Sequence, residues 1–595
     1  MTVRLVEIRL LEGPNVYRLE PVVKLEVAVG RRRTWYGQRD PGKHALVLLG
    51  ANVPARDRPD QVAAIVAWIR RLRVDHGEGR AGIAVHRSSD PGHWIVTFPW
   101  IGEERARILT EAALALADRD VSPSRTARLT GAQERLLARW SERIGTASAS
   151  PPTWIRDVDR RVPIVSITGT NGKSTVTRLI THILMLAGRH VGTTTSDGVL
   201  VDERMVDPGD WTGPGGAHTV LARTDITVAV LETARGGIVL RGVGYESNDA
   251  SVLTNVSSDH LDLQGIHTLP ELAEVKATVC RITKPDGWVI LNGDDRYVGV
   301  VGRRVRANVA LFSTDPNGVG PALVRRHVAA GGRAYLIRNG WLLEVGRGPR
   351  GGAYETRIAE VARIPITIGG LARHNVANSL AAAGGARGLG ATIEEVRHGL
   401  IDFRPSAERS PGRLNLFRVG QRVVIVDFAH NEAGISAVLD VAEGIAAGAA
   451  GRAAPITAII GTAGDRPDDT LRGIGRIAAE RAQRVAIKQT LGYLRGRTAA
   501  TVVGELLAGV TAGGGTANEV PVYDSETIAL KAELNGSSGN ALGRGADAPR
   551  VIVLMCHEDR DGVFQLLDDL GARPLDVTSE LTKLVPRLQD RPRRD

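Results

Sequence analysis

Several residue types are rare in this chain, and each shortage excludes a class of protein. The 595 residues include two cysteines, Cys280 and Cys556, so no disulfide framework is expected and a reducing cytoplasm is the expected location. Aromatic residues make up 4% of the sequence, too few for a surface that stacks nucleic-acid bases. Apolar runs such as "VIVLM" are far shorter than the roughly 20 residues that cross a bilayer, so no membrane contact is expected.

Lysine is also scarce, and the net charge of +10 comes mostly from arginine. The arginines are spread along the chain, and the runs at 31–33 and 591–594 are short, so we expect no nucleic-acid partner. The opening "MTVRLVEIRL" alternates charged and apolar residues as a strand does and lacks the layout of a signal peptide. The few lysines that fall inside motifs therefore merit individual attention.

The hydrophobic pattern predicts an α/β protein of three domains. Residues 1–145 form a small mixed α/β unit in which "VRLVEIRLLEG", "VVKLEVAVG" and "HWIVTFPW" alternate like strands, with two segments of helical spacing between and after them. "GTASASPPT" (145–153) and "SAERSPGR" (406–413) have linker composition. Buried-strand runs alternate with helices over 154–405 and again over 410–595, which predicts mostly parallel sheets. The stretch 535–549 is expected to be a surface loop.

The segment "VSITGTNGKST" predicts a phosphate-binding loop between a strand and a helix. Ile167 stands where the longer Walker A pattern has a glycine, so this loop is a shortened form. Glycines let backbone amides close on phosphate oxygens, and a helix N-terminus adds partial positive charge. Lys173 would supply a cation to the β- and γ-phosphates, and Ser174 or Thr175 a hydroxyl to Mg²⁺. The alternative is a glycine-rich turn without a ligand.

Further motifs follow this loop in a fixed order. They are "VLETARGG" with Glu232, "TNVSSDHLD" with Asn255 and His260, "EVKATV" with Lys276, "LARHNVANSL" with His374, Asn375 and Asn378, "PGRLN" with Arg413, and "VDFAHN" with Asp427, His430 and Asn431. Together with "TGTNGKST" they resemble the Mur ligase superfamily, whose members join a carboxylate to an amine at the expense of ATP. The resemblance implies a central P-loop ATPase domain followed by a Rossmann-like C-terminal domain.

The same resemblance implies roles for individual residues. Catalytic roles fall to Lys173, Glu232, His260, Lys276 and Arg413; Mg²⁺ contacts to Ser174, Glu232, His260 and Lys276; and ATP contacts to Gly169, Thr170, Asn171, Gly172, Lys173, Ser174, Thr175, His374, Asn375, Asn378, Arg413, Asp427 and His430. Lys276 is implied to be carbamylated, which would turn a cation into an anionic metal ligand.

Each of these residues also has a plainer interpretation. Glu232 could be a surface carboxylate, and His260 a structural histidine. His374 and Asn375 could cap a helix, and Lys276 could be a solvated helix lysine. The order of the motifs favours the functional interpretation in each case.

Several segments point to one branch of the superfamily. "GTTTSDG" (192–198), "TGPGGAHTVL" (212–221), "LETARGGIVLRG" (231–242), "GDR" (464–466) and "LRGR" (494–497) resemble the Mur-ligase-like half of cyanophycin synthetases, which adds arginine to aspartate side chains. "RLLEGPNVY" resembles their N-terminal domain. The ATP-grasp domain of those enzymes has no counterpart between the two parts here, which implies that this chain does not build the polymer from free amino acids.

We therefore predict an ATP-dependent, ADP-forming acid–amino acid ligase that activates a carboxylate as an acyl phosphate. Its partners would be a small or polymeric carboxylate, possessing an aspartyl or related group, and an amine such as arginine. Two alternatives stay open: a Mur-like nucleotide-binding regulatory or scaffold protein without ligation, and a ligase for another amine. Homo-oligomerisation also stays open.

Overall fold

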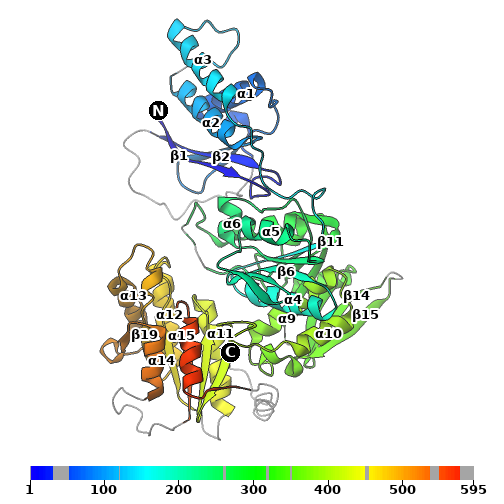
Figure 1. Ribbon diagram of the computed structural model, residues 1–595, viewed down its shortest axis with the longest axis vertical. Coiled ribbons are helices and arrows are strands. Elements are labelled where there is room, and N and C mark those ends of the chain that lie inside the picture. Colours follow the sequence, from blue (N-terminus) through cyan, green and yellow to red (C-terminus); the bar gives the residue numbers. More distant parts are fainter. Residues whose placement is uncertain are drawn as a thin grey trace.

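A computed structural model describes residues 2–30, 52–119, 121–258, 261, 263–315, 320–348, 351–448, 454–535 and 549–575. Three sheets follow one another along the chain, the first at the top of Figure 1 and the last at the lower left. His260 and most of the predicted loop 535–549 lie outside the described residues. Within them, no helix is long and apolar enough to cross a membrane.

The first sheet has four antiparallel strands in the order β1-β2-β4-β3. The strands are β1 (Thr2–Leu11), β2 (Val22–Gly30), β3 (Ala84–Arg87) and β4 (His93–Pro99), and the helices are α1 (Asp60–Asp75), α2 (Glu103–Asp118) and α3 (Gly131–Thr146). The predicted strands and the first two helices are confirmed. Strand β3 and helix α3 were not predicted, because the first is short and the second has one buried residue, Ile144.

The central sheet has eleven strands in the order β15-β14-β13-β12-β11-β10-β5-β9-β6-β7-β8. The run from β13 to β6 is parallel, and antiparallel hairpins extend it at both edges. The strands are β5 (Ile164–Thr168), β6 (Val191–Thr194), β7 (Gly198–Val201), β8 (Arg204–Pro208), β9 (Val228–Glu232), β10 (Asn248–Leu253), β11 (Thr283–Asn292), β12 (Asn308–Ser313), β13 (Arg333–Arg338), β14 (Trp341–Arg347) and β15 (Ala353–Glu360).

Helices cover both faces of this central sheet (Figure 1). They are α4 (Lys173–Leu186), α5 (Pro214–Leu221), α6 (Arg235–Leu240), α7 (Leu269–Arg281), α8 (Ala322–Ala329), α9 (Arg373–Gly388) and α10 (Ile393–Asp402). Alternation along β5 separates two cores: Val165 and Ile167 pack with α4, α9 and α10, whereas Ile164 packs with α5, α6 and α7. The predicted doubly covered parallel sheet is therefore confirmed.

The third sheet has seven strands in the order β20-β19-β18-β21-β17-β16-β22. The strands are β16 (Asn415–Val419), β17 (Arg422–Asp427), β18 (Ile456–Ile460), β19 (Arg484–Lys488), β20 (Val522–Tyr523), β21 (Arg550–Met555) and β22 (Arg573–Pro574); the helices are α11 (Glu432–Gly448), α12 (Asp468–Arg481), α13 (Ala499–Ala512), α14 (Glu526–Asn535) and α15 (Arg560–Asp569). Strands β17 to β21 pair in parallel, as a Rossmann-like domain requires. We propose that each sheet marks one domain.

Candidate active site

The predicted phosphate loop connects β5 to α4. Gly169 and Gly172 have φ of 149° and 86°, values that L side chains rarely adopt. A Cβ at Gly172 would lie 2.3 Å from Asn378 Oδ1, so glycine is also required for space. Helix α4 begins at Lys173 without a side-chain cap, and its first amides have no partner within the helix. The loop therefore has the backbone geometry of an anion site.

Two residues after β10 hold this loop in shape. Asn255 Oδ1 accepts from the Asn171 amide at 3.0 Å, and Asn255 Nδ2 donates to the Asn171 carbonyl at 2.9 Å. Thr254 Oγ1 donates to the same carbonyl at 2.7 Å. Strands β5 and β10 are neighbours in the sheet, which is why these side chains meet. Asn255 thus fixes the conformation of the loop.

Glu232 ends β9, the other neighbour of β5, and its side chain is buried beside the loop. Its Oε2 has no hydrogen-bond partner among the described residues. Burial raises the pKa of Glu232, whereas the charges of Lys173 and Arg413 oppose that shift. The plainer interpretation as a surface carboxylate is wrong. A buried carboxylate oxygen near cations and hydroxyls is a suitable ligand for a hard metal ion.

Two lysines donate to backbone carbonyls of the loop. Lys173 Nζ donates to the Thr170 carbonyl at 2.9 Å. Lys276 is buried on α7, and its Nζ donates to the Gly169 carbonyl at 2.6 Å. The alternative of a solvated helix lysine is therefore wrong. Because a carbamate nitrogen keeps one hydrogen, this bond is compatible with the predicted modification, which stays a prediction.

The His-Asn…Asn motif lies at the start of α9. Asn378 Nδ2 donates to Asn375 Oδ1 at 2.9 Å, and Asn375 Nδ2 donates to the Ile366 carbonyl at 3.0 Å. The helix cap is Ala372, so the alternative that His374 or Asn375 caps this helix is wrong. Burial lowers the pKa of His374 to about 4, which keeps its imidazole neutral at physiological pH. The Asn378 side chain lies close to Gly172, while His374 lines a cavity.

That cavity lies between the central and the C-terminal sheets. Its volume is about 310 Å³, enough for part of a nucleotide. It brings together nine of the residues predicted to bind ATP, namely Asn171, Gly172, Thr175, His374, Asn375, Asn378, Arg413, Asp427 and His430. These residues are far apart in the sequence. They meet because β17 and α11 lie close to the phosphate loop.

Arg413 reaches from the interdomain linker to the loop. Its Nη2 lies 3.4 Å from Ser174 Oγ and 3.3 Å from Ser196 Oγ, and its guanidinium packs 4.6 Å from the centre of the Phe428 ring. Asp427 accepts from the Leu414 amide at 2.8 Å. Burial raises the pKa of Asp427 to about 6, although Arg413 lowers it.

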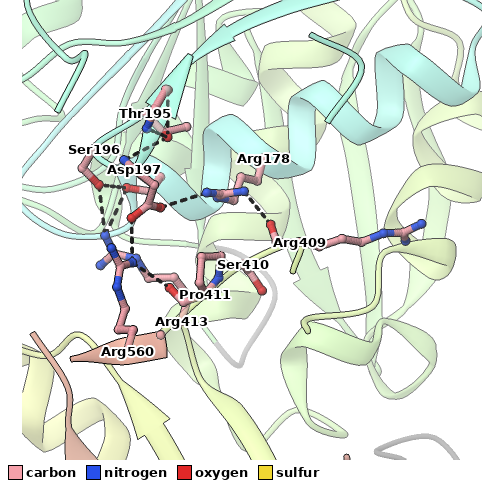
Figure 2. A network of polar contacts seen from close by, with 12 residues as sticks. Arg178, Thr195, Ser196, Asp197, Arg409, Ser410, Pro411, Arg413 and Arg560 are labelled. Atoms are coloured by element: carbon pink, nitrogen blue, oxygen red, sulfur yellow. Dashed lines mark hydrogen bonds and ion pairs between the residues drawn. The ribbon is translucent and has the colours of Figure 1, made fainter. Parts of the chain in front are cut away.

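One contact to the phosphate loop and one ion-pair cluster could not be seen in the sequence motifs. Asn431 Nδ2 donates to Asn171 Oδ1 at 3.1 Å, so the C-terminal domain contacts the phosphate loop directly. Arg178, Asp197 and Arg560 form an ion-pair cluster next to Arg413 (Figure 2). The sequence could have placed Arg178 near Ser174, because it follows Ser174 by one turn of the same helix.

The "GDR" and "LRGR" segments meet at the carboxyl ends of β18 and β19. Arg497 Nη1 donates to the Arg466 carbonyl at 3.2 Å, and the Gly464 amide donates to the Tyr493 carbonyl at 2.9 Å. Asp465 Oδ1 is buried and has no hydrogen-bond partner among the described residues. The carboxyl ends of parallel strands are where α/β sheets bind ligands.

Comparisons with known proteins show which proteins this chain is similar to. Residues 167–386 match the Mur ligase middle domain. A cyanophycin synthetase from Trichormus variabilis is 38% identical over 64% of this chain and 41% of its own length. A UDP-N-acetylmuramoyl-L-alanyl-D-glutamate–2,6-diaminopimelate ligase from Alkalilimnicola ehrlichii is 29% identical over 56% of this chain and 61% of its own length.

The chain spans about two fifths of the length of the cyanophycin synthetases that it matches. Among solved structures, a Mycobacterium tuberculosis folylpolyglutamate synthase complexed with ADP and AMPPCP aligns over 70% of this chain and 92% of that chain, at 19% identity and a TM-score of 0.47. That overall likeness is loose, and the architecture rests on the elements described above. Residues 167–386 thus resemble the Mur ligase middle domain, and larger parts of the chain are similar to cyanophycin synthetases and to a Mur ligase.

Proposed function

We propose that this protein is an ATP-dependent ligase that phosphorylates a substrate carboxylate and couples it to an amine. The observation that carries the proposal is the meeting of three elements at Ser174. The phosphate loop presents Ser174 at the start of α4, Glu232 lies buried beside it, and Arg413 contacts its hydroxyl from the linker. A simple glycine-rich turn does not need this convergence of charge.

The residues present fit Mg²⁺. Glu232 offers a buried oxygen without a partner among the described residues, and Ser174 and Thr175 offer hydroxyls. We assign these three side chains to the metal, and His260 and Lys276 to the same centre. When bound, Mg²⁺ would neutralise part of the phosphate charge.

The chain's own residues then perform three tasks. The loop amides and Lys173 hold the β- and γ-phosphates so that a carboxylate oxygen attacks the γ-phosphorus and ADP leaves. Arg413 stabilises the charge that develops during this transfer. The amine next attacks the acyl carbon and loses a proton as phosphate departs. The C-terminal domain covers the site, and exclusion of water protects the acyl phosphate from hydrolysis.

For the amine we propose arginine or another basic amino acid, and for the acid an aspartyl or related carboxylate. The similarity to cyanophycin synthetases supports both assignments. Asp465 supports the first, because a buried carboxylate oxygen without a partner at a ligand-binding edge would pair well with a guanidinium or ammonium group.

ADP release across a matrix of acids and amines tests the proposal. We expect ADP to form when an aspartyl-containing acid and a basic amine are both present, with the amide product identified by mass spectrometry. Neutral or acidic amines reacting far faster would contradict the amine assignment. ATP turnover that no acid or amine alters would instead indicate a regulatory or scaffold protein.

A further inference from the structure

The linker between the central and C-terminal domains is held by two arginines that lie on opposite sides of it. Arg178, on α4, donates through Nη1 to the Arg409 carbonyl at 2.6 Å. Arg560, at the start of α15, donates through Nη1 to the Pro411 carbonyl at 3.3 Å. One arginine belongs to the phosphate-loop helix and the other to the C-terminal domain, so the linker is attached to both.

A single carboxylate joins these two arginines (Figure 2). Asp197 Oδ2 accepts from Arg178 Nη2 at 2.8 Å, and Asp197 Oδ1 accepts from Arg560 Nη1 at 2.6 Å. The Asp197 side chain is 7% exposed, so water screens these pairs little. Burial alone would raise the pKa of Asp197, but Arg413, Arg560 and Arg178 together lower it below its ordinary value. Asp197 is therefore charged throughout the physiological pH range.

The residue before Asp197 contacts the end of the same linker. Ser196 Oγ lies 3.3 Å from Arg413 Nη2, and this nitrogen also contacts Ser174 Oγ. The loop itself is fixed, because Thr195 Oγ1 accepts from the Asp197 amide at 3.1 Å. Ser196 and Asp197 thus both act on the linker. Ser196 contacts Arg413, and Asp197 binds the two arginines that donate to linker carbonyls.

We propose that Asp197 is a positioning residue for Arg413: by holding Arg178 and Arg560 together, it fixes the linker so that Arg413 reaches the phosphate loop. This role rests on the proposed function, in which Arg413 stabilises the phosphoryl transfer. The charge balance explains why a carboxylate is needed. Arg178, Arg413 and Arg560 are three like charges, and without Asp197 their repulsion would favour separation of the domains.

A merely structural ion pair would be expected to affect stability alone, whereas a positioning residue acts on geometry during turnover. Asp197→Asn keeps the size of the side chain and removes its charge. We expect kcat to fall about 10²-fold, as for a small displacement of a catalytic group, while the Kd for ATP changes by less than about threefold. Amide hydrogen exchange in residues 406–413 should become faster by about tenfold, because the Ser410 and Arg413 amides bonded within the linker would open more often.

Asp225→Asn is the matched control. It removes a carboxylate that pairs with Arg223 in the same domain, but on a surface where the Asp225 side chain is 54% exposed. It should leave kcat and linker exchange unchanged. Arg560→Gln removes the same link from the C-terminal side and should reproduce the faster exchange, so the test survives even if Asp197→Asn does not fold.

Linker exchange that stays at the wild-type rate in both Asp197→Asn and Arg560→Gln would overturn the proposal. So would a kcat for Asp197→Asn equal to that of Asp225→Asn. The exchange measurement needs no turnover, so it tests the linker role of Asp197 separately from the proposed ligase activity. A wild-type protein that forms no ADP with any acid and amine overturns the proposed function, while the exchange data still decide whether Asp197 holds the linker.

Discussion

The central domain contacts its two neighbours in chemically different ways. On the N-terminal side, backbone-to-backbone bonds accompany side-chain pairs such as Arg241 with Glu12: the Glu12 amide donates to the Arg241 carbonyl and the Val243 amide to the Pro14 carbonyl, both at 2.7 Å. The contact is so close that a Cβ on Gly13 would lie 1.8 Å from the Val243 carbonyl oxygen. Such an interface requires a fixed alignment of two chain segments.

On the C-terminal side, the contacts described above come from side chains: Arg560 to Asp197, Arg413 to Ser174, and Asn431 to Asn171. Side chains can exchange partners through rotamer changes while the backbone elements stay intact. We propose from this difference that the N-terminal domain is mounted on the central domain and that the C-terminal domain is able to open, as the proposed ligase would need in order to admit ATP and release ADP.

The largest loss of activity should follow a change in the phosphate loop, which the C-terminal domain contacts. Lys173→Ala removes the cation of the phosphate loop, and we expect ligation to fall by about 10²–10³-fold or more with an unchanged melting temperature. Steady-state ADP release and calorimetry measure the two quantities. Lys531→Ala, on the exposed surface of α14, is the control. Wild-type turnover in Lys173→Ala would remove this loop from the mechanism.

The second change is on α7, a helix of the central domain that lies between the N-terminal domain and the phosphate loop. His267 Nε2 lies 3.1 Å from Asp90 of the N-terminal domain just before α7, whereas Lys276 further along it reaches Gly169. If Lys276 is carbamylated, Lys276→Ala should be inactive and partly rescued by formate or acetate, which replaces the lost anionic oxygen. Full activity of Lys276→Ala, or a wild-type mass and density map that both show only an ordinary amine, would contradict the modification.

A change at the N-terminal interface should lower stability and have little effect on turnover. Gly13→Ala forces a methyl group onto the Val243 carbonyl, and we expect a loss of about 1–3 kcal/mol in stability with faster proteolysis of the N-terminal domain. Turnover per folded molecule should change far less than in Lys173→Ala. Gly131→Ala is the control, because the nearest atom to its added Cβ is Arg135 Nη1 at 3.5 Å. Equal proteolysis of the two variants would argue against a fixed interface.

The last change tests the charge balance at the interface between the central and C-terminal domains. Burial raises the folded-state pKa of Asp427 from 3.8 to about 6, so the folded chain binds this proton more tightly than the unfolded chain. Stability from this group is therefore present at low pH and is lost as pH rises from about 4 to about 6. Asp427→Asn should stabilise the protein by about 1–3 kcal/mol at pH 7.5 and leave it unchanged near pH 4.

The control for that measurement is Asp469→Asn, whose native side chain is 98% exposed. Chemical denaturation at the two pH values measures both variants. A stability difference for Asp427→Asn that is the same at pH 4 and pH 7.5 would contradict the raised pKa.

The sequence predicted the strands and the loop because those features are local. Alternating and continuous apolar runs fix β2, β5 and β18, and "GTNGKST" fixes a strand–turn–helix by itself. The roles of Asn255 and Asn378 could not be predicted, since their partners in the loop are about 80 and 200 residues distant. A motif marks such residues without revealing that Asn255 bonds to the loop backbone or that Asn378 lies against Gly172.

The same limit applies to Asp197. Its two arginine partners lie in different domains, and no spacing rule connects position 197 with position 560. Helix α3 was missed for another reason: its sequence is mostly polar, and a single buried residue gives a weak periodic pattern.

The burial of both cysteines has a practical consequence for following the movable domain. Cys280 and Cys556 are buried, and burial raises the pKa of each thiol, that of Cys280 to about 12. Neither side chain would react readily with a maleimide, and the chain contains no further cysteine. Pairs of fluorophores could therefore be attached to newly introduced surface cysteines in the otherwise unaltered protein, and the proposed opening of the C-terminal domain could be watched one molecule at a time.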